Sequence, residues 1–259
     1  MVNLAANLSM MFNEVGFMER FKKASDSKFK GVEYLFPYDF PKEDISNELN
    51  GNNLEQVLFD LPAGDWENGD RGIAVDPNKK NEFKEGVGLA LEYAELLNPQ
   101  NLTCLVGKAP SNVSDNEARS ILIENLSYAA TETKKAGIKL LVEPINTLDI
   151  PGYWLHNTKK AIEIIKEVNN SNLLLQYDIY HMQIMEGNII NTISSNINMI
   201  GHMQLADNPG RHEPGTGELN YPVIFEKLDQ MGYEKWIGCE YVPIADSVSG
   251  LVWANTFLS

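Results

Sequence analysis

The chain has 259 residues, of which 43% are hydrophobic and 22% are charged. This length and apolar content suffice for one large domain with a substantial buried core. The formal net charge is −15, a field that repels phosphate backbones and anionic lipid headgroups. Nucleic acids and membrane surfaces are therefore not expected as partners.

The ends of the chain and its cysteines indicate a reducing compartment. The first residues, MVNLAANLSMMF, contain no basic leader, and no apolar run approaches the roughly 20 residues that span a bilayer. The two cysteines, Cys104 and Cys239, lie far apart in hydrophobic runs. This spacing is typical of buried, reduced thiols rather than of a zinc ribbon or redox motif. We expect a cytoplasmic protein.

Short apolar segments rich in β-branched and aromatic residues recur along the chain. Eight of them are expected to be strands, namely LAANLS (4–9), GVEYLF (31–36), EQVLFDL (55–61), NLTCLVG (101–107), IKLLVE (138–143), NLLLQYD (172–178), IGHMQLAD (200–207) and WIGCEY (236–241). The longer stretches between them show helical periodicity. This alternation is typical of a parallel sheet built from βα units.

Two helices are marked clearly between the third and fifth strands. One helical face is shared by Phe83, Val87, Ala90, Leu91, Ala94 and Leu97. A second helix is expected to begin at a capping box of Ser114 and Glu117 and to stop at Gly137. Residues 61–79, LPAGDWENGDRGIAVDPNK, form a long connection after the third strand, and loops of this length are often lids or binding loops.

No Pro/Gly/Ser-rich linker and no shift in composition divides the chain. A single domain over residues 1–259 is the simplest interpretation. Eight strands alternating with helices predict an α/β fold, a (β/α)8 TIM barrel, with its active site at the carboxyl ends of the strands. A doubly wound open sheet is the alternative, but no Gly-x-Gly-x-x-Gly fingerprint follows the first strand.

Polar side chains stand at the carboxyl ends of the last four predicted strands. They are Glu143, Asp178, Gln204 and Glu240, separated by 35, 26 and 36 residues. Each interval is close to the roughly 30 residues or more of one βαβ repeat. In a barrel, these four oxygen-bearing side chains would face one point.

Three carboxylates that face one point repel one another, and a divalent cation between them relieves the repulsion. Ligation by oxygen alone favours Mg²⁺ or Mn²⁺ over zinc. The alternative is that each acid sits at a solvated barrel mouth, paired with a helix N-terminus or a basic residue. The agreement of all four positions with the strand rhythm favours the metal site.

Four further residues are candidates for binding a small oxo or hydroxy acid. His181 follows Asp178 by three residues, and we expect it in a loop above the metal, where it would donate a hydrogen bond to a substrate oxygen. Arg211, in the Gly/Pro-rich loop after the seventh strand, is a candidate anchor for a carboxylate, together with Arg71 and Lys108. The alternative for each cation is an ordinary surface charge.

Nine blocks of sequence resemble a known family. They are NLSMMF, VEYLFPYD, LPAGDW, LVGKAP, VEPIN, DIYHMQ, ADNP, RHEPGTGELNY and GCEY. Together they resemble the hydroxypyruvate isomerases, members of the xylose isomerase-like barrel superfamily, nearly from end to end. The resemblance implies isomerisation of hydroxypyruvate to tartronate semialdehyde and a place in glyoxylate metabolism.

The same resemblance implies roles for individual residues. It makes the metal ligands Glu143, Asp178, Gln204 and Glu240. Glu143 and Glu240 would also be the acid–base pair. Our hypothesis for the reaction is that one glutamate takes the C3 proton of the substrate and that a proton returned at C2 completes the conversion. His181 and Arg211 match positions that bind substrate oxygens in the related ketose 3-epimerases.

Some positions depart from the family pattern. Val242 stands in GCEYVP where a lysine is expected, and Phe59 and Asp60 precede LPAGDW where close relatives carry His-Asn. Substrate preference is therefore less well defined than reaction type. A 2-oxotetronate isomerase, which shares NLSMMF and the HEP…GE.NYP block, or a ketose 3-epimerase is the alternative.

Two more distant functions agree less well with the sequence. A metallonuclease of the same barrel class needs more histidines than the four present, His156, His181, His202 and His212, and the charge of −15 also argues against it. A protein that binds a metal and a small acid without turnover would have no use for two acid–base glutamates. The oligomeric state is open, with a homo-oligomer as one alternative.

Overall fold

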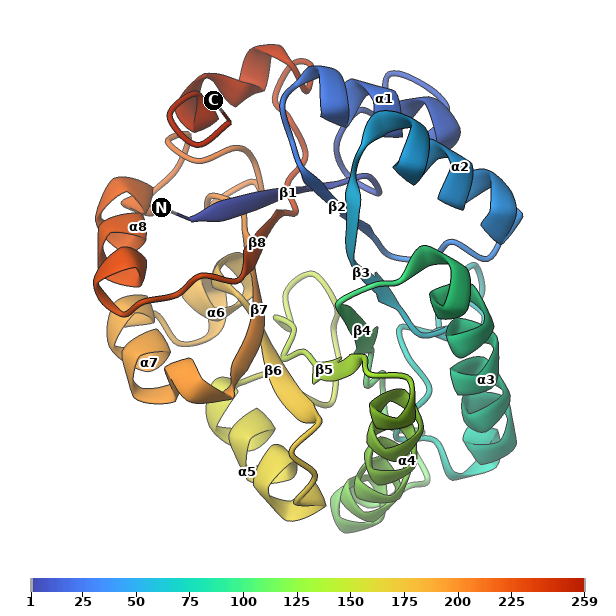
Figure 1. Ribbon diagram of the computed structural model, residues 1–259. Helices are drawn as coiled ribbons and strands as arrows, with labels where there is room; N and C mark the ends of the chain where they lie inside the picture. The colour runs from blue at the N-terminus through green and yellow to red at the C-terminus, as the bar shows by residue number, and fades with distance from the viewer. Residues whose placement is uncertain (1, 259) are drawn as a thin grey trace.

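The computed structural model describes residues 2–258 and shows a closed barrel of eight parallel strands (Figure 1). Each strand pairs with the next in sequence, and β8 pairs with β1. The strands are β1 (Asn3–Asn7), β2 (Gly31–Tyr34), β3 (Glu55–Asp60), β4 (Asn101–Cys104), β5 (Lys139–Val142), β6 (Leu173–Asp178), β7 (Ile200–Leu205) and β8 (Trp236–Cys239). All eight predicted strands and the (β/α)8 fold are confirmed.

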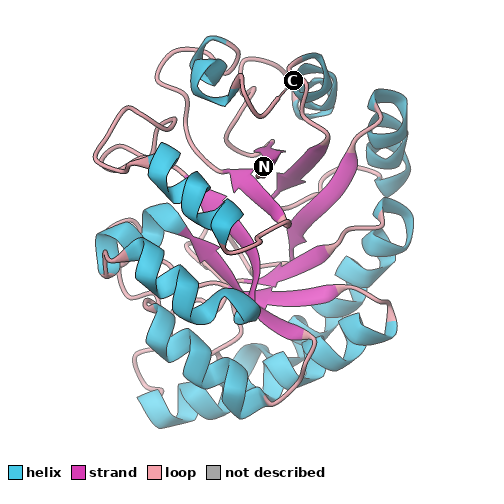
Figure 2. Cartoon of the chain, turned by 60° about the vertical axis from the view of Figure 1, so that its left-hand side comes forward, coloured by secondary structure: helices cyan, strands magenta, loops and turns pink. Residues whose placement is uncertain are grey.

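Helices surround the barrel on its outside (Figures 1 and 2). They are α1 (Phe17–Asp26), α2 (Lys42–Asn52), α3 (Lys80–Leu97), α4 (Asp115–Lys135), α5 (Thr158–Val168), α6 (Ile179–Met185), α7 (Ile189–Asn196) and α8 (Tyr221–Gln230). The described residues also form three short 3₁₀ helices, η1 (Pro77–Lys79), η2 (Ile197–Met199) and η3 (Ser249–Ala254). Between residues 2 and 258, none of the helices has the length and apolar character needed to cross a bilayer.

The two helices marked in the sequence form for the expected reasons. The inner face of α3 buries Phe83, Val87, Ala90, Ala94 and Leu97. The hydroxyl of Ser114 accepts a hydrogen bond from the backbone N–H of Glu117 at 3.2 Å, which caps the first turn of α4. Gly137 follows α4 with a φ of 77°, the left-handed conformation that ends a helix.

The barrel interior changes from apolar to polar along the strands. A small apolar cluster inside the barrel contains Ala5, Val57, Leu58 and Leu141. Two residues beyond Ala5 on the same face of β1 lies the buried Asn7. Its neighbour Glu33 on β2 is also fully buried. This polar layer lies below the carboxyl ends of the strands and supports the side chains described next.

Candidate active site

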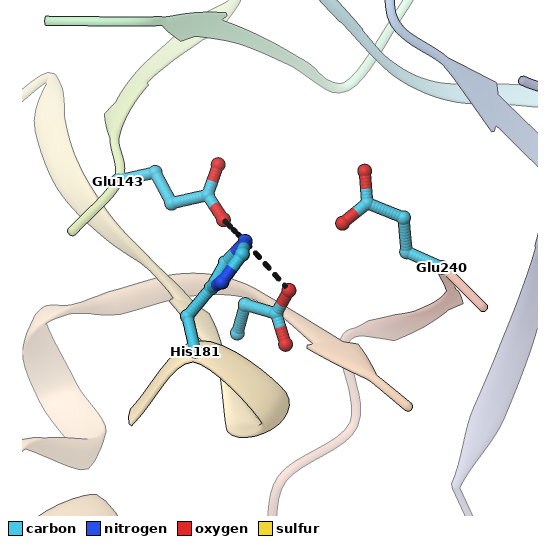
Figure 3. A group of neighbouring side chains, drawn as sticks. Glu143, His181 and Glu240 are labelled. Carbon is cyan, nitrogen blue, oxygen red and sulfur yellow. Dashed lines mark ion pairs between the residues drawn. The ribbon is translucent and has the colours of Figure 1, made fainter. Parts of the chain in front are cut away.

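Three carboxyl groups and one imidazole meet at the carboxyl end of the barrel. Glu143 follows β5, Asp178 ends β6, His181 lies in α6, and Glu240 follows β8. One potential ligand atom from each lies within 4.8 Å of the others, and all four residues are buried. Glu143 and His181 lie close together, and Glu240 faces them from the opposite side (Figure 3). The structure therefore brings together three of the four predicted metal ligands and one predicted substrate-binding residue.

The cluster contains two carboxylate oxygens that accept no hydrogen bond from the described residues. Oε2 of Glu143 accepts a hydrogen bond from Nε2 of Gln176 at 3.0 Å, and Oδ1 of Asp178 accepts one from the backbone N–H of Tyr180 at 2.8 Å. The remaining oxygens, Glu143 Oε1 and Asp178 Oδ2, are buried without a hydrogen bond among the described residues. Buried, unpaired carboxylate oxygens are costly unless a cation occupies the space between them. These residues therefore fit a hard divalent cation.

The position of His181 differs from the prediction. It lies in the first turn of α6 rather than in a loop, because Asp178 caps that helix directly at the end of β6.

Asn146 is held in one orientation beside His181. The backbone N–H groups of Leu148 and Asp149 both donate to Oδ1 of Asn146, at 3.0 and 2.8 Å. The amide nitrogen of Asn146 must then face His181 Nδ1, which lies 2.6 Å away.

This contact defines the tautomer of His181. An amide nitrogen is only a donor, so Nδ1 accepts and Nε2 carries the proton. Burial, aided by the Arg211 guanidinium, lowers the pKa of His181 well below its usual value, so the ring is neutral. Its Nε2–H lies 3.5 Å from Asp178 Oδ2 and 3.9 Å from Glu143 Oε1. His181 thus presents a hydrogen-bond donor to the cluster, rather than a lone pair for a metal.

Arg211 is the cation of the site. Its Nη2 lies 2.6 Å from Glu240 Oε2 and 3.7 Å from Asp178 Oδ2. Burial opposes its charge, but these carboxylates hold the pKa of Arg211 above its usual value. The backbone N–H of Val242 donates to the Arg211 carbonyl at 2.9 Å and holds its loop against the end of β8. Nε of Arg211 is buried without a partner among the described residues and is free to donate to a substrate.

The three carboxyl groups hold protons more tightly than free acids do. Burial raises the pKa of Glu240 to about 8, although Arg211 lowers it. Burial and then the Glu240 charge raise the pKa of Glu143 well above its usual value. Burial also raises the pKa of Asp178. A divalent cation would displace these protons, because metal ligation requires the charged form of each carboxylate.

Gln204 on β7 lines the same cavity and is fixed by the polar layer below. Its Oε1 accepts from Gln176 Nε2 at 2.7 Å, and its Nε2 donates to Glu33 Oε1 at 2.8 Å. Glu33 also accepts from Asn7 Nδ2 at 3.0 Å, and its second oxygen lies 2.7 Å from His202 Nε2. A carbonyl oxygen has a second lone pair, so metal ligation by Gln204 stays a prediction.

The cavity over the cluster has about 610 Å³ of space, its open mouth included. Its other walls are mostly aromatic and aliphatic and include Tyr34, Leu58, Trp66, Leu105, Ile145 and Ile150, with Asn7, Asp60 and Asp149 as further polar residues. Trp66 comes from the 61–79 loop, so the prediction of a binding loop agrees with the position of this side chain. The apolar walls limit the polar contacts of a ligand to a few positions.

Arg71 and Lys108 do not line this cavity. The guanidinium of Arg71 stacks on the Trp66 ring at 4.1 Å and donates to the carbonyls of Trp66 and Asp70, at 2.9 and 2.6 Å. Lys108 is exposed. Their predicted contact with a substrate carboxylate therefore has no support in the arrangement of these side chains.

Residues of the site that were not identified from the sequence as parts of it include Glu33, Asp60, Trp66, Asn146 and Gln176. Asp60 ends β3, so it could have been found in the same way as Glu143, as a polar residue at the carboxyl end of a predicted strand. Glu33 and Gln176 are single polar residues inside apolar strand segments. Their position inside apolar strand segments was the signal that the sequence offered, because a polar side chain buried there needs partners inside the barrel.

Comparison with known proteins identifies the family. Residues 21–254 match the model of the xylose isomerase-like TIM barrel family. The chain is 47% identical over 257 residues to hydroxypyruvate isomerase of Escherichia coli (strain K12), covering 99% of this chain and 100% of the relative. It is 43% identical over 258 residues to 2-oxo-tetronate isomerase of Cupriavidus necator, covering 100% and 99%.

A solved structure is similarly close. A Brucella melitensis protein described as AP endonuclease, family 2, has a TM-score of 0.97 and 44% identity over 99% of both chains. This agreement extends over the whole barrel and its loops. The chain belongs to the xylose isomerase-like TIM barrel family.

Proposed function

We propose that this protein is an isomerase that interconverts hydroxypyruvate and 2-hydroxy-3-oxopropanoate (tartronate semialdehyde). The observation that carries the proposal is the pair of buried oxygens without a hydrogen bond, Glu143 Oε1 and Asp178 Oδ2, in a cluster that Glu240 completes. This donor set suits Mg²⁺ or Mn²⁺, held by Glu143, Asp178, Glu240 and Gln204. The full-length similarity to a hydroxypyruvate isomerase supports the choice of substrate.

The reaction moves one proton between neighbouring carbons. When bound, the divalent cation supplies Lewis acidity that favours the negative charge of an enediolate. One of the two glutamates, Glu143 or Glu240, accepts the C3 proton, and the electron pair of that bond forms the C2–C3 double bond. A proton then returns at C2, while the hydroxyl proton passes from O3 to O2, which leaves an aldehyde at C3.

The arrangement of the side chains fits these steps. Glu143 and Glu240 project into the cavity from opposite sides (Figure 3). Burial raises the pKa of Glu240 to about 8 and raises the pKa of Glu143 above its usual value, which favours uptake of a proton by either carboxylate. The Nε2–H of His181 and the free Nε of Arg211 can donate to the oxygens on which negative charge develops.

A second candidate is a 2-oxotetronate isomerase, since a relative of that name is 43% identical over the full chain. A ketose 3-epimerase would use the same cluster. A nuclease is disfavoured by the site, because one imidazole among the described residues reaches the cluster. His202 is engaged by Glu33 at 2.7 Å, and His212 Nδ1 lies 2.7 Å from the carbonyl of Val242.

Proton NMR in D₂O tests the proposal directly. Chelator-treated protein is incubated with hydroxypyruvate before and after addition of Mg²⁺ or Mn²⁺. We expect metal-dependent formation of tartronate semialdehyde that carries deuterium at C2, because the abstracted proton exchanges with solvent. If neither conversion nor exchange at C3 occurs, hydroxypyruvate is not the substrate. The same assay with 2-oxotetronates and longer ketoses then distinguishes the alternatives.

Several finer expectations stay predictions. They are the identity of the metal, a role in glyoxylate metabolism, a cytoplasmic location, a homo-oligomeric state, and substrate contacts from Arg71 or Lys108.

A further inference from the structure

Asp60 is a buried acid that the reaction described above does not use. It is the last residue of β3, it is 5% exposed, and it lines the cavity. Its backbone is held on both sides, because its N–H donates to the Leu35 carbonyl at 2.8 Å and its carbonyl accepts from the Tyr38 hydroxyl at 2.6 Å. The carboxyl group itself has no hydrogen bond among residues 2–258.

The other acids in this region each have a donor. Glu33 accepts from Asn7 and Gln204, Glu143 accepts from Gln176, and Glu240 pairs with Arg211. Asp60 has no such donor, and the charged or titratable groups facing it are Glu33, Glu143, Glu240, Tyr38 and Cys104. None of these is a cation. Asp60 is therefore the acid in this cavity for which ionisation is least compensated.

The surroundings of Asp60 favour its neutral, protonated form, which can donate a hydrogen bond, over the charged carboxylate. Burial, followed by the Glu240 and Glu33 charges, raises the pKa of Asp60 well above its usual value. A carboxylic acid that stays neutral in an apolar site can donate a strong hydrogen bond. The walls beside Asp60 include Leu58, Trp66 and Tyr34, whose hydroxyl is buried without a hydrogen bond among the described residues. The O–H of Asp60 is thus, with the Tyr34 hydroxyl, a donor available on this side of the cavity.

The barrel order places this donor across from Arg211. In a closed barrel of eight strands in sequence order, β3 and β7 lie on opposite sides, and Arg211 is in the loop after β7. A three-carbon substrate whose carbonyl and hydroxyl oxygens face the cluster, His181 and Arg211 has one polar group left, its carboxylate. This group needs a donor on the far wall.

We propose that Asp60 is a specificity-determining residue that meets the substrate as a neutral carboxylic acid and donates a hydrogen bond to the substrate carboxylate. The inference rests on the proposed function, which gives the substrate this carboxylate. An ionised Asp60 would instead repel it.

Two small probes and two variants test the proposal in Mn²⁺-loaded protein. Pyruvate keeps the carboxylate and the 2-oxo group, whereas dihydroxyacetone keeps the hydroxy ketone and lacks the carboxylate. Asp60→Asn keeps a neutral donor of the same shape, and Asp60→Leu keeps the size without a donor. Dissociation constants are measured by calorimetry, and the Mn²⁺ affinity of each variant is measured by electron paramagnetic resonance.

We expect a loss of binding affinity only for Asp60→Leu, the variant without a donor, and only for pyruvate, the probe with a carboxylate. Asp60→Leu should weaken pyruvate binding about tenfold or more, because the carboxylate of the probe loses a hydrogen bond to a charged group. Dihydroxyacetone binding should change less than about threefold. Asp60→Asn should bind pyruvate and Mn²⁺ within about threefold of the parent, because no charge is removed.

Three outcomes would overturn the proposal. If Asp60→Asn binds pyruvate much more tightly and Mn²⁺ more weakly, Asp60 is an ionised group. If Asp60→Leu affects both probes alike, Asp60 does not recognise a carboxylate. If the parent does not bind pyruvate, the carboxylate subsite is absent. Turnover of hydroxypyruvate by the parent separates these failures from failure of the proposed function, which the NMR assay decides independently.

Discussion

Gly238 on β8 is the position where one added methyl group should disrupt the support of the site. A Cβ at this position would lie 2.1 Å from Glu33 Oε1, 2.3 Å from Oε2 and 2.3 Å from the carboxyl carbon. These separations are far shorter than any van der Waals contact. Glu33 is completely buried, so Gly238→Ala forces its carboxyl group to move within a packed interior.

The cost follows from what holds Glu33 in place. Its carboxyl group accepts from Asn7 at 3.0 Å and Gln204 at 2.8 Å, and lies 2.7 Å from His202 Nε2. Hydrogen bonds to charged groups contribute about 1.5–3 kcal/mol each. If two of the three contacts are lost, Gly238→Ala lowers the free energy of unfolding by about 3–6 kcal/mol. Because Gln204 loses its anchor, Mn²⁺ affinity should fall as well.

Chemical denaturation monitored by circular dichroism measures this loss. Gly88→Ala is the control, because a Cβ there meets nothing within 4 Å and a helical alanine should stabilise α3 by about 0.5–1 kcal/mol. A double-mutant cycle with Glu33→Ala identifies the cause, since truncating Glu33 removes the clash. A loss below about 1 kcal/mol, or an equal loss with and without Glu33, would refute the reasoning.

Four further predictions concern the cluster and its neighbour Asn146. Glu143→Gln and Glu240→Gln should each lower kcat about 10²–10⁴-fold without loss of fold, as followed by the NMR assay and thermal denaturation; an active variant removes that residue from acid–base catalysis. At pH 7, Mn²⁺ binding should release protons because burial raises the pKa of Glu240 to about 8, and calorimetry in buffers of different ionisation enthalpy should detect them. Since this pKa is above the unfolded value, the metal-free protein should lose the stability that Glu240 contributes as pH rises through about 8, and a metal-free unfolding midpoint unchanged between pH 6 and pH 9 contradicts this. Asn146→Ala should raise KM or lower kcat while Mn²⁺ affinity is kept, because His181 Nδ1 loses its partner at 2.6 Å; weakened Mn²⁺ binding would instead make His181 a metal ligand.

The part of the site that could be predicted from the sequence consists of acids at the carboxyl ends of strands. Glu143, Asp178 and Glu240 were selected because they end apolar runs at the spacing of βα units, and the closed barrel brings these ends together. The same local patterns predicted the eight strands and the boundaries of α4. These features depend on residues near one another in the chain, so a single sequence contains the information.

Other features depend on the paths of loops and on contacts across the barrel. Asp178 caps α6 directly at the end of β6, so His181 lies in a helix and not in the expected loop. This depends on the backbone geometry at one strand end. Arg71 and Lys108 follow strand ends as Arg211 does, yet the fold turns Arg71 onto Trp66 and leaves Lys108 exposed. Charge and position in the chain do not distinguish these three cations.

By itself, the sequence determined the barrel, the order of its strands and the set of acids at their ends, because hydrophobic period and strand spacing are local properties. Only the tertiary structure decided which polar groups pair. Glu33 binds Gln204 from across the barrel, Asn146 sets the tautomer of His181, and Asp60 is left without a donor in the cavity wall. These pairings join residues 35 and 171 positions apart or leave one unpaired, and closure of the barrel is what creates them.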